Sequence, residues 1–98
     1  MNMQQMIIQA QKMQREMQKK QKELEEKEFT ISKGGAVTVV VKGDKTVKSI
    51  DIDKDALDPD NKEMVEELVA LAINEAIEQI KTAEAAISES VKGSGPLF

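Results

Sequence analysis

The chain contains no cysteine, histidine, tryptophan or tyrosine, and its only aromatic residues are Phe29 and Phe98. Without cysteine it has no disulfide and no thiolate ligand, and without histidine it lacks the usual general base near neutral pH. These absences exclude a Ser-His or Cys-His nucleophile pair and give little support for stacking of unpaired bases. The composition therefore predicts a protein that is not an enzyme, with no catalytic residues and no metal, cofactor or small-molecule substrate.

Long apolar segments are also missing. The run from Leu68 to Ile73 is six residues long, whereas a membrane-spanning helix needs about 20. The first positive charge is Lys12, so no signal peptide is indicated at the N-terminus. A helix over residues 1–22 could lie on a membrane surface, but its apolar side has methionines instead of Trp, Phe and Leu. We therefore expect a soluble cytoplasmic protein that makes no membrane contact.

One acidic stretch resembles the start of a calcium-binding EF-hand loop. Counted from Asp51, the sixth position is Ala56 where the loop needs glycine, and the twelfth is Lys62 where it needs glutamate. The pattern is better explained as the polar face of a strand that runs into a turn, so no metal site is predicted here.

The N-terminal region has a heptad pattern. Apolar residues recur every seven positions and again three positions after each of these, with one lysine in the series: Met3, Met6, Ala10, Met13, Met17, Lys20 and Leu24. We call this series the heptad seam. Gln, Lys, Glu and Met are strong helix formers, so residues 3–26 are predicted to form one helix that packs against a partner.

The next region alternates between apolar and polar residues and is rich in Val, Ile and Thr. Gly34-Gly35 and Gly43-Asp44 interrupt it, so residues 28–53 are predicted to form three antiparallel strands joined by tight turns. Asp58 and Pro59 then provide an N-cap and a first helical residue, and apolar residues continue at helical spacing to about Val91. The predicted fold is α+β, with the order α-β-β-β-α and a three-stranded meander.

These elements divide a single domain into four parts. Residues 1–27 are the N-terminal helical arm, 28–53 the sheet, 58–91 a long helix and 92–98 a flexible tail. The long helix would extend about 48 Å, more than twice the length of such a sheet. A single chain would then leave the heptad seam and the far end of the long helix exposed. We therefore predict a homodimer whose interface includes Met6, Met13, Met17, Ile77 and Ile80.

Positive charge is concentrated in the arm. Residues 1–22 carry five basic residues and one acid, whereas residues 23–98 carry nine basic residues and seventeen acids. The spacing of Lys12, Arg15, Lys19 and Lys22 places them in one line on the helix, opposite the heptad seam. This line, the basic stripe, would run for about 15 Å and could contact DNA phosphates, with Lys20 at its edge. An ordinary solvated helix face is the alternative interpretation.

Three segments together resemble the YbaB/EbfC family of bacterial nucleoid-associated proteins. They are QAQKMQREMQKKQKELEEKEF (9–29), GGAVTVVVKGDKTVKSIDID (34–53) and MVEELVALAINEAIEQIK (64–81), and the terminal GPLF is similar to the usual ending of that family. The resemblance implies a tweezer-like homodimer with long helices as its arms. It also implies a non-catalytic protein that binds double-stranded DNA, alters its conformation and contributes to nucleoid organisation or gene regulation.

A second interpretation is a module for protein–protein contacts. The order of helix, hairpin and helix is also similar to that of prefoldin-type chaperones, which pair long helices as coiled coils and need no DNA. Prefoldin helices are markedly longer than the N-terminal helix available here. DNA binding by residues Lys12, Arg15, Lys19, Lys20 and Lys22 is therefore the expectation carried forward.

Overall fold

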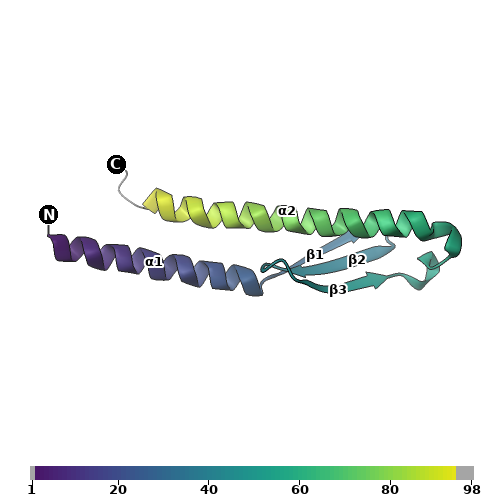
Figure 1. Cartoon of the computed structure of the whole chain (residues 1–98), viewed down its shortest axis with the longest axis horizontal. Coiled ribbons are helices and arrows are strands. Elements are labelled where there is room, and N and C mark those ends of the chain that lie inside the picture. The colour runs from purple at the N-terminus through teal and green to yellow at the C-terminus, as the bar shows by residue number, and fades with distance from the viewer. Residues whose placement is uncertain (1, 95–98) are drawn as a thin grey trace.

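The computed structural model describes residues 2–94, with side chains described as far as residue 90. Its elements follow the predicted order, namely α1 (Met3–Glu26), β1 (Glu28–Lys33), β2 (Val37–Lys42), β3 (Val47–Ile52) and α2 (Lys62–Ser94). The molecule is a rod of 70 × 21 × 14 Å, in which α2 runs back over the sheet and then along α1 (Figure 1). The prediction of an α+β fold with three antiparallel strands between two long helices is confirmed.

Side chains that accept hydrogen bonds from free backbone N–H groups mark the start of α1 and of the short turn that precedes α2. Asn2 Oδ1 accepts one from the backbone N–H of Gln4 at 2.9 Å, which starts α1. Asp58 was expected to cap the long helix, but it caps a short 3-10 turn over Pro59–Asn61 that leads into α2 at Lys62. At its other end α2 continues to Ser94, three residues beyond the predicted end. Residues 95–98 of the predicted tail lie outside the described residues.

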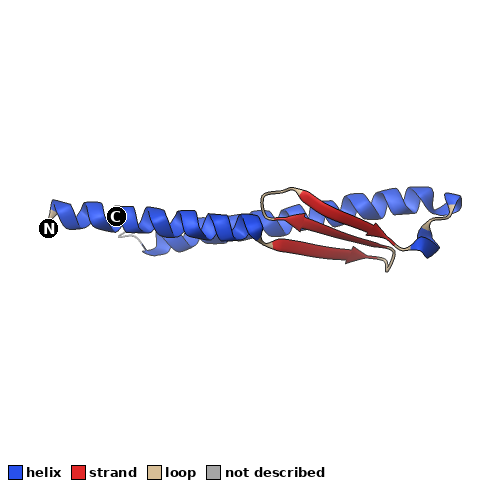
Figure 2. Ribbon diagram, turned by 90° about the horizontal axis from the view of Figure 1, so that it is seen from below, coloured by secondary structure: helices blue, strands red, loops and turns tan. Residues whose placement is uncertain are grey.

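The three strands form one antiparallel sheet in the order β1-β2-β3 (Figure 2). The turn between β1 and β2 needs positive φ angles, 60° at Gly34 and 65° at Gly35, which glycine adopts without a steric penalty. Alternation then directs one side of each strand toward α2. On β1 and β2 these side chains are buried, and they are Phe29, Ile31, Val37, Val39 and Val41.

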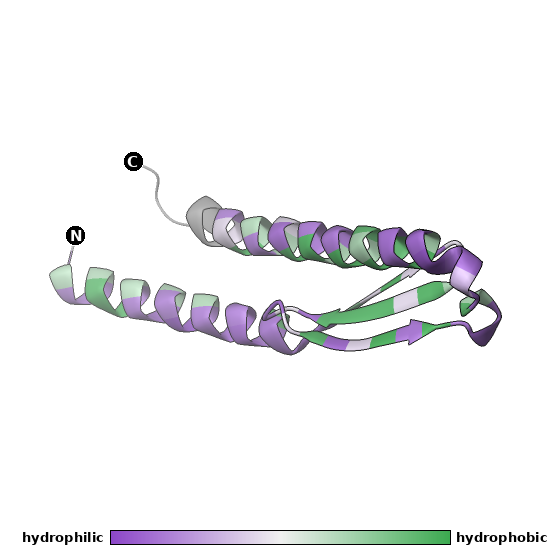
Figure 3. Cartoon of the chain, turned by 45° about the vertical axis from the view of Figure 1, so that its right-hand side comes forward, coloured by the Kyte–Doolittle hydropathy of each residue, from purple (hydrophilic) through white to green (hydrophobic). Residues whose placement is uncertain are grey.

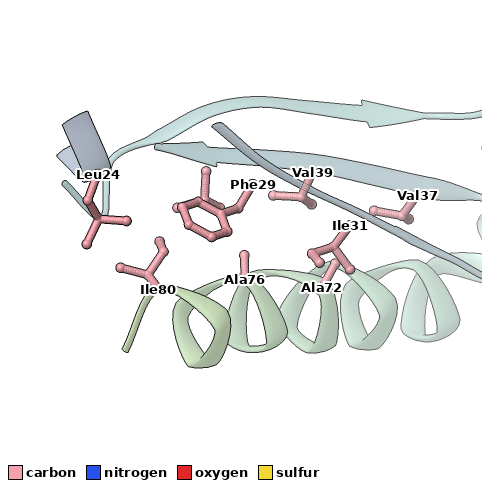
Figure 4. Packing of buried hydrophobic residues seen from close by; sticks show 9 residues of the cluster. Leu24, Phe29, Ile31, Val37, Val39, Ala72, Ala76 and Ile80 are labelled. Atoms are coloured by element: carbon pink, nitrogen blue, oxygen red, sulfur yellow. The ribbon is translucent and has the colours of Figure 1, made fainter. Parts of the chain in front are cut away.

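The core lies between this sheet face and α2 (Figure 4). Ala72, Ala76 and Ile80 have no exposed surface and follow each other at intervals of one helical turn. The two alanines allow the helix to approach the strands closely, and Ile80 packs beyond them toward Leu24 at the end of α1 (Figure 4). The core therefore continues from the sheet into the contact between the two helices.

One expectation about the single chain was wrong in part, because the C-terminal half of the heptad seam is covered while Met3 and Met6 stay exposed. The C-terminal half of α2 does extend past the sheet, but there it lies beside α1, so each helix covers part of the other (Figure 1). Leu24 is buried and Met13 and Met17 are half-buried. The heptad pattern correctly indicates a partner, and over this length the partner is the same chain.

The third strand is covered much less than the other two, because α2 packs mainly on β1 and β2. Ile50 pairs with Val39, and Val47 pairs with Val41 across an irregularity in the register. Both side chains therefore share the apolar side of the sheet, yet Val47 is 41% and Ile50 46% exposed. An uncovered apolar strip remains along β3.

Candidate nucleic-acid interface

The basic stripe lies along the side of α1 that faces away from α2. Met13, Met17 and Leu24 turn toward α2 and are at least half-buried, whereas Lys12, Arg15, Lys19 and Lys22 are all exposed. Helical geometry places these four residues on the opposite side from that contact. The structure thus brings the four together in one line, as the spacing predicts.

Within the described chain the cations of the stripe are free of ion pairs, whereas several lysines elsewhere are paired. In the described part of the chain five lysines pair with carboxylates, and none of these five belongs to the stripe: Lys33 with Glu75, Lys45 with Glu84, Lys48 with Glu28, Lys62 with Glu66 and Lys81 with Glu78. Within residues 2–90 the four stripe cations have no carboxylate within 4.0 Å, the limit for an ion pair. They are therefore available to phosphates without first breaking an existing pair.

Lys20 is placed differently from the other basic residues of α1. Its Nζ donates a hydrogen bond to Ser90 Oγ of α2, at 2.8 Å. It occupies a position of the heptad seam and extends from there across to the second helix. The structure therefore places Lys20 on the helix-to-helix side and apart from the stripe.

Carboxylates mark the base of the arm. Glu23, Glu25 and Glu26 close α1, directly before the sheet. At the tip of the β2–β3 turn, Asp44 accepts hydrogen bonds from Thr46, which lower the pKa of its carboxyl group, so it is ionised at neutral pH. The electrostatic field therefore favours a polyanion along residues 12–22 and repels it from the sheet end.

The described residues meet neither the requirements of a metal site nor those of a membrane-spanning helix. Among residues 2–94 no three carboxylates are grouped so that they could hold a metal ion. No helix within the same residues is long and apolar enough to cross a membrane.

The residues expected at the dimer interface occupy three different environments. Met6 is 51% exposed near the free end of α1, and Met13 and Met17 are half-buried against α2. Ile77 is half-buried, and Ile80 has no exposed surface because it belongs to the core of its own chain. Sequence reasoning missed the strip along β3, because whether Val47 and Ile50 are covered depends on the path of α2.

Comparison with known families decides the classification. A family model described as the YbaB/EbfC DNA-binding family matches residues 1–95. The chain belongs to this family. The match covers all of α1, the sheet and α2, so this YbaB/EbfC member matches its family over both the arm and the body.

Several relatives are described as nucleoid-associated proteins. A nucleoid-associated protein of Mycoplasmopsis pulmonis is 45% identical over 91 residues, which cover 93% of this chain and 90% of the relative. One from Clostridium novyi is 48% identical and covers 94% of this chain and 79% of the relative. One from Lactococcus lactis is 42% identical, with 95% and 96% covered. This YbaB/EbfC chain is thus similar to nucleoid-associated proteins over nearly its whole length.

Proposed function

We propose that the protein is a non-catalytic, nucleoid-associated protein of the cytoplasm that binds double-stranded DNA through the basic stripe. The observation that carries this is a line of four exposed cations without ion pairs among the described residues, on a protein that is otherwise acidic. Family membership and the names of the relatives support DNA as the partner. No feature of the described residues favours the prefoldin-type alternative.

The stripe accounts for binding to DNA and gives little basis for reading its sequence. Contacts from lysine and arginine to phosphates are independent of sequence and weaken steeply as salt is added. The side chains between them on this face are mostly glutamines, and the helix has no aromatic residue. We therefore expect low sequence specificity and strong salt dependence.

The neighbouring lysines 19 and 20 test this assignment most directly, because they have the same charge and differ in direction. Lys19→Gln removes a phosphate contact and should reduce the slope of log K against log salt by about 0.9 for each arm engaged. Lys20→Gln removes a hydrogen bond to Ser90 and should leave that slope nearly unchanged. A gel-shift titration against unrelated duplexes at several salt concentrations measures both. An equal reduction of the salt slope in the two variants would show that DNA does not distinguish the stripe side of α1 from the side that faces α2.

We further propose that the protein is a homodimer whose second copy covers the strip along β3. Ile50 and Val47 lie on the apolar side of the sheet but have no cover in one chain. Glu84 of α2 pairs with Lys45 in the β2–β3 turn. Ile77 precedes Glu84 by seven residues, or about two helical turns, so it lies on the same side of α2, toward β3. A two-fold axis beside β3 would bury both copies of this surface and leave both arms free.

Ile50→Glu should therefore convert the dimer into a monomer, because it buries a charge in the proposed interface. Light scattering should give about twice the chain mass of 10.9 kDa for the wild type and about that mass for the variant. Met6→Glu is the matched control, since Met6 is as exposed as Ile50 but lies on α1, and it should stay dimeric. If Met6→Glu dissociates the dimer and Ile50→Glu does not, the interface lies on the heptad seam.

A further inference from the structure

The basic stripe continues beyond Lys12 to an apolar residue. Ile8 precedes Lys12 by four positions, so residues 8, 12, 15, 19 and 22 follow one line with alternating steps of four and three. Ile8 is 60% exposed, although it is a large apolar side chain. It lies on the side of α1 away from the heptad seam, so the contact between α1 and α2 does not explain it.

The position of Ile8 in the molecule leaves it open to a ligand. The first turns of α1 lie beyond the end of α2 and carry green, hydrophobic segments among purple ones, whereas the middle of the helix is mostly hydrophilic (Figures 1 and 3). A shallow hollow includes Ile8 in its lining, together with two glutamines, one cation, one carboxylate and one residue of the heptad seam, namely Gln5, Gln9, Lys12, Glu16 and Met13. Glutamine would be a better helix former than the β-branched isoleucine here, so helix formation does not explain this residue.

The charge around Ile8 identifies what it contacts. A molecule that touches Ile8 along this face also meets the four unpaired cations of the stripe, so it must be a polyanion. An apolar surface within a polyanion is found in duplex DNA, in the floor of the minor groove and between stacked bases. The second copy of this chain is already placed against β3 in the proposed dimer, which leaves this face of α1 free.

We propose that Ile8 is an apolar wedge that enters the minor groove when the stripe binds the phosphates. This rests on the proposed DNA binding. Ile8 lies about 6 Å beyond Lys12 along the helix, a distance that reaches from a bound phosphate to the adjacent groove. Apolar side chains inserted in this way unstack a base step and kink the duplex by about 20–90°. Pyrimidine–purine steps deform most easily, so the wedge favours duplexes that contain them.

Ile8→Gln tests the wedge in the full-length protein. Two duplexes of equal length carry dyes at their ends, one with central TA steps and one with a stiff A-tract. The wild type should increase energy transfer on the TA duplex and bind it about fivefold more tightly than the A-tract. Ile8→Gln should lose both effects and keep the wild-type salt slope, because it removes no phosphate contact.

Ile7→Gln is the matched control, because Ile7 is 53% exposed and is rotated about 100° away from Ile8 around the helix. It should bend DNA like the wild type, and so should Ile8→Leu, which keeps an apolar side chain. Unchanged bending in Ile8→Gln, equal loss in Ile7→Gln, or no bending by the wild type would each overturn the wedge. Loss of all binding when Lys12 and Lys19 are both replaced by glutamate, with normal bending in Ile8→Gln, would refute the wedge alone. Normal binding in that double variant would refute the proposed function itself.

Discussion

Replacing Lys12 and Lys19 together with glutamate should abolish DNA binding while the fold and the oligomeric state stay intact. Each change removes a phosphate contact and places a negative charge in the stripe, so a dimer loses four cations and gains four anions. Both residues are exposed and face away from α2, so neither substitution disturbs the core. Eight phosphate contacts in a wild-type dimer correspond to a salt slope of about −7, and four contacts to about −3.6.

Gel shifts with unrelated duplexes at low and moderate salt measure this loss of binding. The circular dichroism signal of helices, at about 222 nm, tests whether the variant is folded. The second check is needed because each new glutamate lies four residues before another, Glu16 or Glu23, a spacing that costs a few tenths of a kcal/mol. Lys45→Glu with Lys48→Glu is the control with the same change in charge. These lysines lie at the sheet and are engaged by Glu84 and Glu28. Binding that is lost in this control and kept in the stripe variant would show that the sheet is the DNA-binding surface.

The local elements were predictable because their signals lie close together in the sequence. Alternating apolar residues between the turns at Gly34-Gly35 and Gly43-Asp44 define the three strands, and the heptad pattern defines α1. The pattern could not identify the partner of Met13 and Met17, since an apolar seam is the same whether it faces its own chain or another. Lys20 belongs to that seam by its spacing, but its bond to Ser90 depends on where α2 returns.

Two features of β3 could not be read from alternation alone. Val47 is three positions from Ile50, which in a regular strand would place them on opposite faces. The irregular register between β2 and β3 brings both to the same face. Whether that face is exposed then depends on the path of α2, which packs mainly on β1 and β2. No short sequence pattern indicates which strands a helix will cover.

The junction between arm and sheet likewise depends on a contact between distant residues. Gly43, in the β2–β3 turn, is buried against the end of α1, and its N–H donates a hydrogen bond to Lys27 O at 2.8 Å. A Cβ at this position would lie 1.7 Å from the carbonyl oxygen of Leu24 and 2.6 Å from its carbon. The glycine therefore allows α1 to lie directly against the turn, and this sets the direction of the arm.

Gly43→Ala should be the most destabilising single change in this part of the molecule. The clash is with backbone atoms, which cannot rotate away as a side chain does, so either the helix end or the turn must shift. Because overpacking commonly costs 1–3 kcal/mol and sometimes more, we expect a loss of about 3 kcal/mol or more in the free energy of unfolding. The corresponding fall in Tm is about 10 °C or more, followed by circular dichroism at equal protein concentrations.

Gly35→Ala is the matched control for this loss. Gly35 has a φ of 65°, but nothing lies within 4 Å of the position that a Cβ would occupy. Its substitution costs about 1–2 kcal/mol from backbone strain alone and leaves the arm in place. Gly43→Ala should additionally weaken DNA binding at temperatures where it is still folded, because the displaced helix end redirects the stripe. A melting temperature for Gly43→Ala equal to or above that of Gly35→Ala would mean that α1 is not packed against the turn, and the direction of the arm would then have to be set elsewhere.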